Sequence, residues 1–187
     1  KTMDYSYVND FRKLGFGMFV HFGLYSVLGK GEWHFQYTRD SRMSDEVAME
    51  RYIEKTFPRF KVAPNWAKAL CKTAKKAGCR YVTLTTRHHE GFSLYDTCGL
   101  NELDAPHSPT QRDLVQEFVD ACREYDLLPV FYHTVIDWWQ KDFQSGNFEA
   151  YFAYLKLSIE ILFTRYGKVG GFWFDGTWGL PQRITFP

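Results

Sequence analysis

The sequence predicts an α/β fold in which about four parallel strands alternate with helices. Short apolar runs, rich in β-branched and aromatic residues, alternate along the chain with longer segments that repeat apolar residues at helical spacing. Elements that alternate in this way form right-handed βαβ units around a parallel sheet. Histidines and an aspartate collect where the apolar runs end, and in a parallel α/β fold, most clearly a (β/α)8 barrel, that edge carries the active site. The length of 187 residues predicts one domain, 1–187.

The helices are predicted from amphipathic spacing and from the glycines that end them. Gly78 and Gly167 each follow an amphipathic segment and are natural helix stops. The segment 45–55 is charged and is interpreted as an insertion between the repeating units. The predicted helices span residues 5–14 (a short helix or arm), 45–55, 65–77, 113–125 and 147–166.

The predicted strands span residues 15–23, 81–86, 127–134 and 170–178. The last one is an unbroken apolar run that leads into Asp175 and is bounded by glycines, which is typical of a strand buried on both faces. A carboxylate at such a place is costly to bury unless it is paired or used. Taken alone, Asp175 most simply caps the next element. Together with the other polar residues at strand ends, it indicates a catalytic carboxylate.

Composition excludes several classes of partner. The 23 basic and 22 acidic residues give a net charge of +1, without the basic footprint of a nucleic-acid-binding protein. No apolar run approaches the ~20 residues of a membrane span. Aromatic residues make up 19% of the chain, which is compatible with a carbohydrate pocket, although a well-packed core explains most of them. Four scattered cysteines and the lack of an apolar leader favour free thiols and a cytoplasmic location.

Four motifs, in this order, resemble the signatures of glycoside hydrolase family 29, the α-L-fucosidases. They are Gly-Met-Phe-Val-His-Phe-Gly-Leu-Tyr-Ser at 17–26, Glu-Trp at 32–33, His-His-Glu-Gly-Phe at 88–92 and Trp-Phe-Asp-Gly at 173–176. The resemblance implies a (β/α)8-like barrel and hydrolysis of α-linked L-fucose with retention of configuration, with no cofactor and no metal. Two departures are small, because Phe22 stands where the family usually has Trp and Glu90 where it usually has Asp.

The resemblance also implies roles for individual residues. Asp175 matches the family's nucleophile, and His21, His88 and His89 match residues that hydrogen-bond the hydroxyls of fucose. The remaining matches are the loop pair Glu32 and Trp33, His133 on the third strand, and Trp173, all at the substrate.

The barrel of the family needs eight strands, and this chain supplies about four. The sequence therefore predicts a half-length (β/α) barrel of the TIM type, which ends before the segment that carries the family's usual general acid/base. Four parallel strands leave open edges and an uncovered apolar face. We expect a homodimer in which two four-stranded halves complete one barrel-like core or pack face to face. The alternatives are a second polypeptide that supplies the other half, or a truncated remnant.

A retaining glycosidase needs a nucleophile and an acid about 5 Å apart. Within the chain, Glu32 is the best acid, because Trp33 beside it would desolvate the carboxyl group and raise its pKa. A role for Glu32 in hydrogen bonding or loop anchoring is equally compatible with its position. Glu90 is expected to orient the neighbouring histidines, and Asp137 is a weaker candidate for the acid.

Two other functions stay open at this point. A catalytically weak or inactive fucose-binding protein would keep the sugar pocket and lose the general acid/base. A metal-dependent hydrolase would use the histidines and Asp175 as ligands. Adjacent side chains on a strand point to opposite faces, so His88 and His89 would share one ion only beyond the end of the strand.

Overall fold

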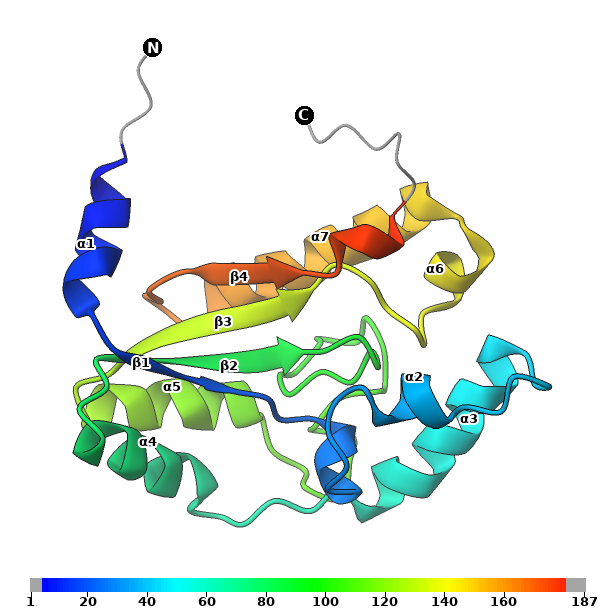
Figure 1. Cartoon of the computed structure of the whole chain (residues 1–187), viewed down its shortest axis with the longest axis horizontal. Coiled ribbons are helices and arrows are strands. Elements are labelled where there is room, and N and C mark those ends of the chain that lie inside the picture. The colour runs from blue at the N-terminus through cyan, green and yellow to red at the C-terminus, as the bar shows by residue number, and fades with distance from the viewer. Residues whose placement is uncertain (1–4, 181–187) are drawn as a thin grey trace.

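Four parallel strands form one sheet, and their spatial order, β1-β2-β3-β4, is also their order along the chain (Figure 1). The computed structural model describes residues 5–180. Helices lie between successive strands, so the predicted half-length (β/α) barrel of the TIM type is confirmed. The strands are β1 (Gly17–Val20), β2 (Tyr81–Arg87), β3 (Leu128–Thr134) and β4 (Phe172–Asp175).

The five predicted helices all form, and their ends lie within one residue of the prediction. They are α1 (Ser6–Leu14), α3 (Asp45–Thr56), α4 (Trp66–Lys76), α5 (Leu114–Glu124) and α7 (Phe148–Arg165). The Asp113 side chain caps α5 by accepting a hydrogen bond from the Gln116 backbone at 2.9 Å. The sequence did not predict α2 (His34–Thr38) and α6 (Lys141–Ser145), because five residues are too few to establish a helical period. Short 3-10 turns are η1 (Leu24–Val27), η2 (Phe57–Arg59) and η3 (Thr177–Gly179).

The first and last strands are shorter and more exposed than predicted. Each was expected to span nine residues and has four, because the chain leaves the sheet soon after the apolar run. The prediction that the last strand is buried on both faces is wrong, since Trp173 is 58% and Phe174 46% exposed. The physical reason is that, within residues 5–180, β4 is the last strand of the sheet and pairs on one side only, with β3.

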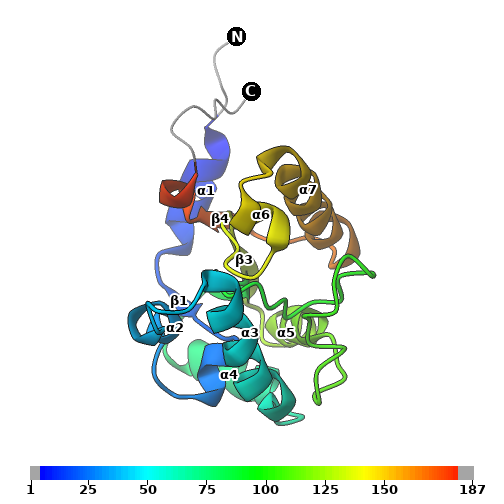
Figure 2. The ribbon, with the colours of Figure 1, turned by 90° about the vertical axis from the view of Figure 1, so that its right-hand side faces the viewer.

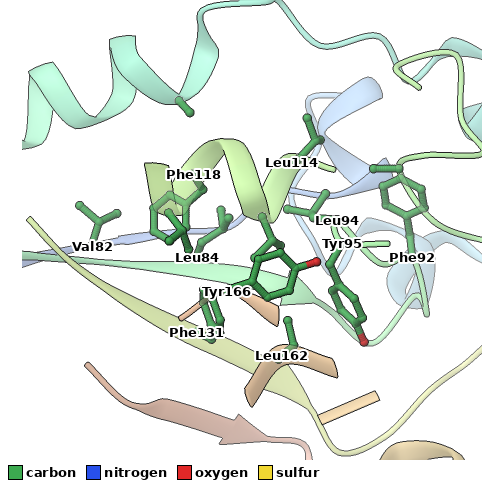
Figure 3. Close-up of a cluster of buried hydrophobic side chains, with 14 of the residues drawn as sticks. Val82, Leu84, Phe92, Leu94, Tyr95, Leu114, Phe118, Phe131, Leu162 and Tyr166 are labelled. Carbon is green, nitrogen blue, oxygen red and sulfur yellow. The ribbon is translucent and has the colours of Figure 1, made fainter. Parts of the chain in front are cut away.

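The outer face of the sheet is covered by α4, α5 and α7 and carries the core (Figure 2). Side chains that point outward from β2 and β3, among them Val82, Leu84 and Phe131, are fully buried against residues of α5 and α7 such as Phe118 and Leu162 (Figure 3). Because side chains alternate along a strand, the intervening residues point to the opposite, inner face. The register aligns Phe19 with Thr83 and Val130, and Tyr132 with Trp173, along that inner face.

A β-bulge changes the alternation near the end of β2. Thr85 pairs with Tyr132 and Arg87 pairs with His133, so Thr86 is an extra residue between them. The Thr86 hydroxyl donates a hydrogen bond to the Tyr132 carbonyl at 2.7 Å and so fixes the bulge. As a result, the Arg87 side chain joins His133 on the helix side, and His88 returns to the inner face, where its ring stacks on Tyr132.

The amino-terminal end of the inner face lies under α1, which stands at that end of the sheet (Figure 1). Phe11 of α1 packs against Tyr81, with ring centroids 5.1 Å apart. Between α1 and the sheet is a cavity of about 480 Å³, lined mainly by apolar side chains that include Phe19 and Trp173. No helix within residues 5–180 has both the length and the apolar character needed to cross a bilayer.

Candidate active site at the carboxyl edge of the sheet

The four strands bring polar side chains together where they end, at the edge to which the arrows point in Figure 1. Asp175 is the last residue of β4, and His21 follows β1 by one residue. His88 and His89 follow β2 directly. This convergence is what parallel strand direction predicts for residues at equivalent positions.

Asp175 is held by β3 on one side and lies beside the loop after β2 on the other. The Tyr132 hydroxyl donates a hydrogen bond to Asp175 Oδ2 at 2.9 Å. His89 Nε2 lies 3.7 Å from the same oxygen, which is too long for a hydrogen bond. The Asp175 side chain is 32% exposed, so the carboxylate is fixed by protein contacts and still open to solvent.

The tautomer of His89 follows from its neighbours. The Thr134 hydroxyl donates its hydrogen to the Ile136 carbonyl at 2.5 Å and can therefore only accept from His89 Nδ1, which lies 2.7 Å away. Burial lowers the pKa of His89 to about 4, so the ring is neutral at pH 7. A neutral ring with hydrogen on Nδ1 presents a bare acceptor at Nε2, and this buried atom has no hydrogen-bond partner within residues 5–180.

His88 and His21 lie beside this ring. The His88 ring stacks on Tyr132 with centroids 5.5 Å apart, and His21 meets His88 edge-on at 5.4 Å. Burial, together with the nearby rings of His89 and His21, lowers the pKa of His88 to about 2, so this ring is also neutral. Within the described part of the chain, buried His88 Nδ1 has no hydrogen-bond partner either.

Three tryptophan side chains form a wall around the ring of His89. Trp33 meets His89 with ring centroids 5.4 Å apart, Trp138 does so at 5.3 Å and Trp178 at 5.5 Å. Trp33 also contacts the other two indoles. The wall is therefore built from the loops after β1, β3 and β4, and it places flat apolar surfaces next to unpaired polar nitrogens.

Glu32 lies on the loop before α2, next to Trp33, and is half-buried. Burial lowers the pKa of His89, and the negative charge of Glu32 opposes this shift. Burial and Asp175 raise the pKa of Tyr132, and the charge of Glu32 adds to the rise. Within residues 5–180, the Glu32 carboxylate takes part in no hydrogen bond or ion pair. Glu32 therefore acts electrostatically on the cluster of Asp175, His89 and Tyr132, but no hydrogen bond or ion pair to that cluster holds its carboxylate.

The structure does not bring His133 to this cluster. Its ring is fully buried on the helix side of β3, where Nδ1 donates to the Thr134 carbonyl at 2.7 Å and Nε2 lies 3.1 Å from the Tyr95 hydroxyl. Tyr132, one residue earlier on the inner face, occupies the place that we expected of His133. Trp173 is on the inner face too, where its ring lies 5.6 Å from that of Phe19, and it precedes Asp175 by two residue pairs along β4.

Glu90 does not orient the neighbouring histidines, and that prediction is corrected. Its carboxylate is buried and points to the loop after β1, where Oε1 accepts a hydrogen bond from the Leu24 backbone N–H at 2.6 Å and Oε2 accepts one from the Tyr52 hydroxyl. Burial raises the pKa of Glu90 to about 7. The residue therefore ties the loop that carries His88 and His89 to the loop that follows His21 and to helix α3.

Asp137 is also a structural group, because it is fully buried and not open to a substrate. Its Oδ1 accepts hydrogen bonds from the backbone N–H groups of Trp139 and Gln140 at 3.0 and 2.9 Å. Burial raises its pKa to about 6, against the attraction of the buried Arg87 guanidinium. The Trp138 backbone N–H donates to the His89 carbonyl at 2.7 Å, which joins the loop after β3 to the loop after β2.

No set of three or more histidine, cysteine, aspartate or glutamate side chains within residues 5–180 is arranged to hold a metal ion. Sequence reasoning missed Tyr132 and Trp138 as parts of the site. For Tyr132, the pairing of β3 with the Asp175 strand was the signal that would have found it, since alternation decides which residue faces inward. For Trp138, the only signal was its position four residues beyond the end of β3.

The chain matches one family model and several known proteins. The family model described as Alpha-L-fucosidase matches residues 2–185. The tissue alpha-L-fucosidase of Bos taurus is 30% identical over 190 residues, which cover 92% of this chain and 40% of the bovine protein. The chain therefore spans about two fifths of the length of that curated relative.

Solved structures of alpha-L-fucosidases are also similar to this chain. Alpha-L-fucosidase isoenzyme 1 from Paenibacillus thiaminolyticus superposes with a TM-score of 0.79 and 32% identity, over 92% of this chain and 45% of that one. A family 29 alpha-L-fucosidase from Bacteroides thetaiotaomicron, described as a trapped covalent intermediate with 2-fluoro-fucosyl fluoride, has a TM-score of 0.76 and 29% identity. That match covers 94% of this chain and 42% of the other.

Proposed function

The chain belongs to the alpha-L-fucosidase family, glycoside hydrolase family 29, and we propose that its site removes α-linked L-fucose from fucosylated glycans with retention of configuration. Asp175 is the nucleophile of this proposal, and Glu32 is its general acid within the chain. His21, His88 and His89 bind the sugar hydroxyls, with Trp33 and Trp173 as aromatic contacts. Tyr132 takes the place first given to His133.

The observation that carries the proposal is the pair of unsatisfied imidazole nitrogens next to Asp175. Buried polar atoms in proteins almost always have a hydrogen-bond partner, and exceptions call for an explanation. Among the residues that the structure describes, His89 Nε2 is an acceptor with no donor, and His88 Nδ1 also lacks a partner. A ring of sugar hydroxyls supplies both donors and acceptors, and the indole of Trp33 provides an apolar surface for the C–H face of the same ring.

The contacts of Asp175 suit a nucleophile. In the first step a carboxylate oxygen bonds to the anomeric carbon of fucose while the bond to the leaving oxygen breaks, and that oxygen takes up a proton from the acid. In the second step water, deprotonated by the same group, attacks the anomeric carbon and releases Asp175. The Tyr132 hydroxyl holds Oδ2 and so orients the carboxylate. The covalent intermediate trapped in the Bacteroides relative supports this two-step scheme.

Glu32 is proposed as the acid on the strength of its position. The charges of Glu32 and Asp175 both act on His89 and Tyr132, so both carboxylates face the same cluster. Because its carboxylate is not bound by other groups, Glu32 is free to approach a leaving oxygen. A Glu32→Gln variant is expected to lose activity on a poor leaving group and to keep most of it on an activated aryl fucoside, which scarcely needs an acid. Equal losses on both substrates would assign Glu32 to binding or loop anchoring.

The proposal includes a homodimer. A two-fold axis along the barrel axis would set β4 of one protomer beside β1 of its partner, in parallel, and would bring eight strands together. In support, Phe19 is 42% and Trp173 58% exposed on the inner face that such a partner would cover. The alternative, a further stretch of polypeptide that completes the barrel, accords with the greater length of the relatives. A monomer in sedimentation analysis with a cooperative melt would contradict the dimer.

The deciding experiment is hydrolysis of 4-nitrophenyl α-L-fucoside by the 187-residue chain across a protein dilution series. Asp175→Ala is expected to lower the rate roughly 1,000-fold or more, whereas Asp120→Ala, at an exposed position of helix α5, is expected to leave it unchanged. A specific activity that falls on dilution would support assembly of the site from two chains. Fucose binding without turnover at any concentration would favour the alternative function, a fucose-binding protein without general acid/base.

A further inference from the structure

A second depression lies at the same edge of the sheet as Asp175 but outside the histidine cluster. It is a cavity of about 570 Å³ between α2, the first turn of α3, and α6, the helices that face the viewer in Figure 2. Cavities of about 300–1,000 Å³ are the usual size for small-molecule sites. We call this cavity the α6 groove. Its lining consists of Phe35, Gln36, Arg39, Asp45, Glu46, Trp138, Lys141, Phe143, Gln144 and Ser145.

The α6 groove and the proposed sugar site share one wall. Trp138 lines the groove, and its ring also contacts His89 at 5.3 Å and Trp33 at 5.4 Å. Gln144 of α6 donates a hydrogen bond from its amide to the Trp138 carbonyl at 2.6 Å, which holds this wall from the groove side. Asp175 and the three histidines of the cluster do not line the groove. The two spaces are therefore neighbours separated by one indole.

The chemistry of the groove suits a neutral, hydroxyl-rich ligand. Its aromatic surfaces alternate with side-chain amides, and the Gln36 amide has no hydrogen-bond partner within residues 5–180. Its charges come in opposite pairs, because Lys141 Nζ lies 3.8 Å from Glu46 Oε1 and Arg39 is bonded to Asp45. A groove whose charges are balanced in pairs gives no advantage to a strongly anionic or cationic ligand.

We propose that the α6 groove binds the neutral sugar to which the fucose is attached. This inference rests on the proposed function, since it makes the groove the binding site of the leaving group. The fucosyl ring lies among the histidines, and the next ring of the glycan passes over Trp138 into the groove. There Gln36 hydrogen-bonds its hydroxyls, and Trp138 packs against its C–H face.

The test is a titration of the 187-residue chain with a panel of neutral disaccharides that lack fucose: lactose, N-acetyllactosamine, chitobiose and cellobiose. Binding is followed by ¹H–¹⁵N NMR, with fucose as a separate ligand. We expect at least one disaccharide to shift the resonances of α2 and α6, with binding weakened about fivefold or more in Gln36→Ala. The matched control Gln116→Ala, on helix α5, should bind like the unmodified chain. Fucose should shift the histidine cluster and bind equally well to both variants.

Three results would overturn the inference. If fucose binds and no disaccharide of the panel shifts the groove resonances at 50 mM, the groove is not a sugar site, while the proposed function stands. If disaccharide binding is the same in Gln36→Ala, in Lys141→Ala and in the unmodified chain, the contact lies elsewhere. If a disaccharide binds in the groove and fucose binds nowhere, the proposed function fails, and with it the assignment of the groove to a leaving group.

Discussion

Replacing Glu90 with glutamine tests whether its buried carboxyl group joins the loop after β2 to the loop after β1 and to helix α3. The Glu90 carboxyl group is buried between two donors, the Leu24 N–H and the Tyr52 hydroxyl. In Glu90→Gln the amide oxygen can still accept from Leu24, and the amide nitrogen can donate to the Tyr52 oxygen, which turns to accept. The variant therefore reproduces the shape and the hydrogen bonds of the neutral acid without its ability to ionise.

The magnitude follows from the raised pKa of Glu90. The folded-state value of about 7 lies above the ordinary 4.5, so the neutral form is favoured by folding. The stability that this group contributes is fully present below pH 4.5 and is lost as the pH rises through about 7. Integrated from pH 5 to pH 8, the loss is about 2.5 kcal/mol. The free energy of unfolding of Glu90→Gln, relative to that of the unmodified chain, should therefore rise by about 2.5 kcal/mol between pH 5 and pH 8.

The assay is urea unfolding at half-unit steps from pH 5 to pH 8, followed by tryptophan fluorescence and circular dichroism, with linear extrapolation to water. Glu54→Gln, an exposed position on the same helix as Tyr52, controls for the change in net charge. Parallel stability curves for Glu90→Gln and the unmodified chain would refute the reasoning. A uniform loss at all pH values would mean that the glutamine does not keep the two hydrogen bonds.

Further predictions concern the backbone, the nucleophile and the thiols. Gly91→Ala should lower the free energy of unfolding by about 2–5 kcal/mol, because its φ is +83° and a Cβ would lie 2.5 Å from a buried carboxylate oxygen. Gly99→Ala, with φ +85° and open space, should cost only about 1–2 kcal/mol in the same melts. Tyr132→Phe should lower kcat/KM on the aryl fucoside roughly 10- to 100-fold by removing the hydrogen bond to Asp175, with no change in the folded spectrum. Cys98 is exposed and should react with a thiol reagent in the native state, whereas the other three cysteines are buried and should react only on unfolding.

The elements of the fold could be predicted from the sequence because each has its own local signal. The helix at Leu114–Glu124 has both an apolar period and a capping aspartate, and its ends were found to within one residue. The exposure of β4 could not be predicted in the same way. The run that ends in Asp175 has the composition of a central strand, and it is exposed because no neighbour lies beyond it. Burial depends on tertiary partners that a local pattern does not contain.

This dependence on tertiary partners also limits how much of the site could be predicted from the sequence. The strand ends brought His21, His88, His89 and Asp175 together as expected, because parallel direction alone determines that edge. Whether Tyr132 or His133 lies at the site depends on which of the two side chains points to the inner face of the sheet. The pairing of β3 with its neighbouring strands decides this. The bulge at Thr86 has no sequence signal, so its effect on Arg87 and His88 could not be anticipated.

The agreement between strand order in the sheet and strand order in the chain has a consequence for synthesis. Each new strand pairs with the one made just before it, so no strand has to be inserted between two that are already paired. Contacts between neighbouring units form early and cost little loop-closure entropy. The chain can therefore assemble in the order in which it leaves the ribosome, one strand-helix unit at a time. Any further unit would add at the open edge of β4 without breaking a single existing strand pair.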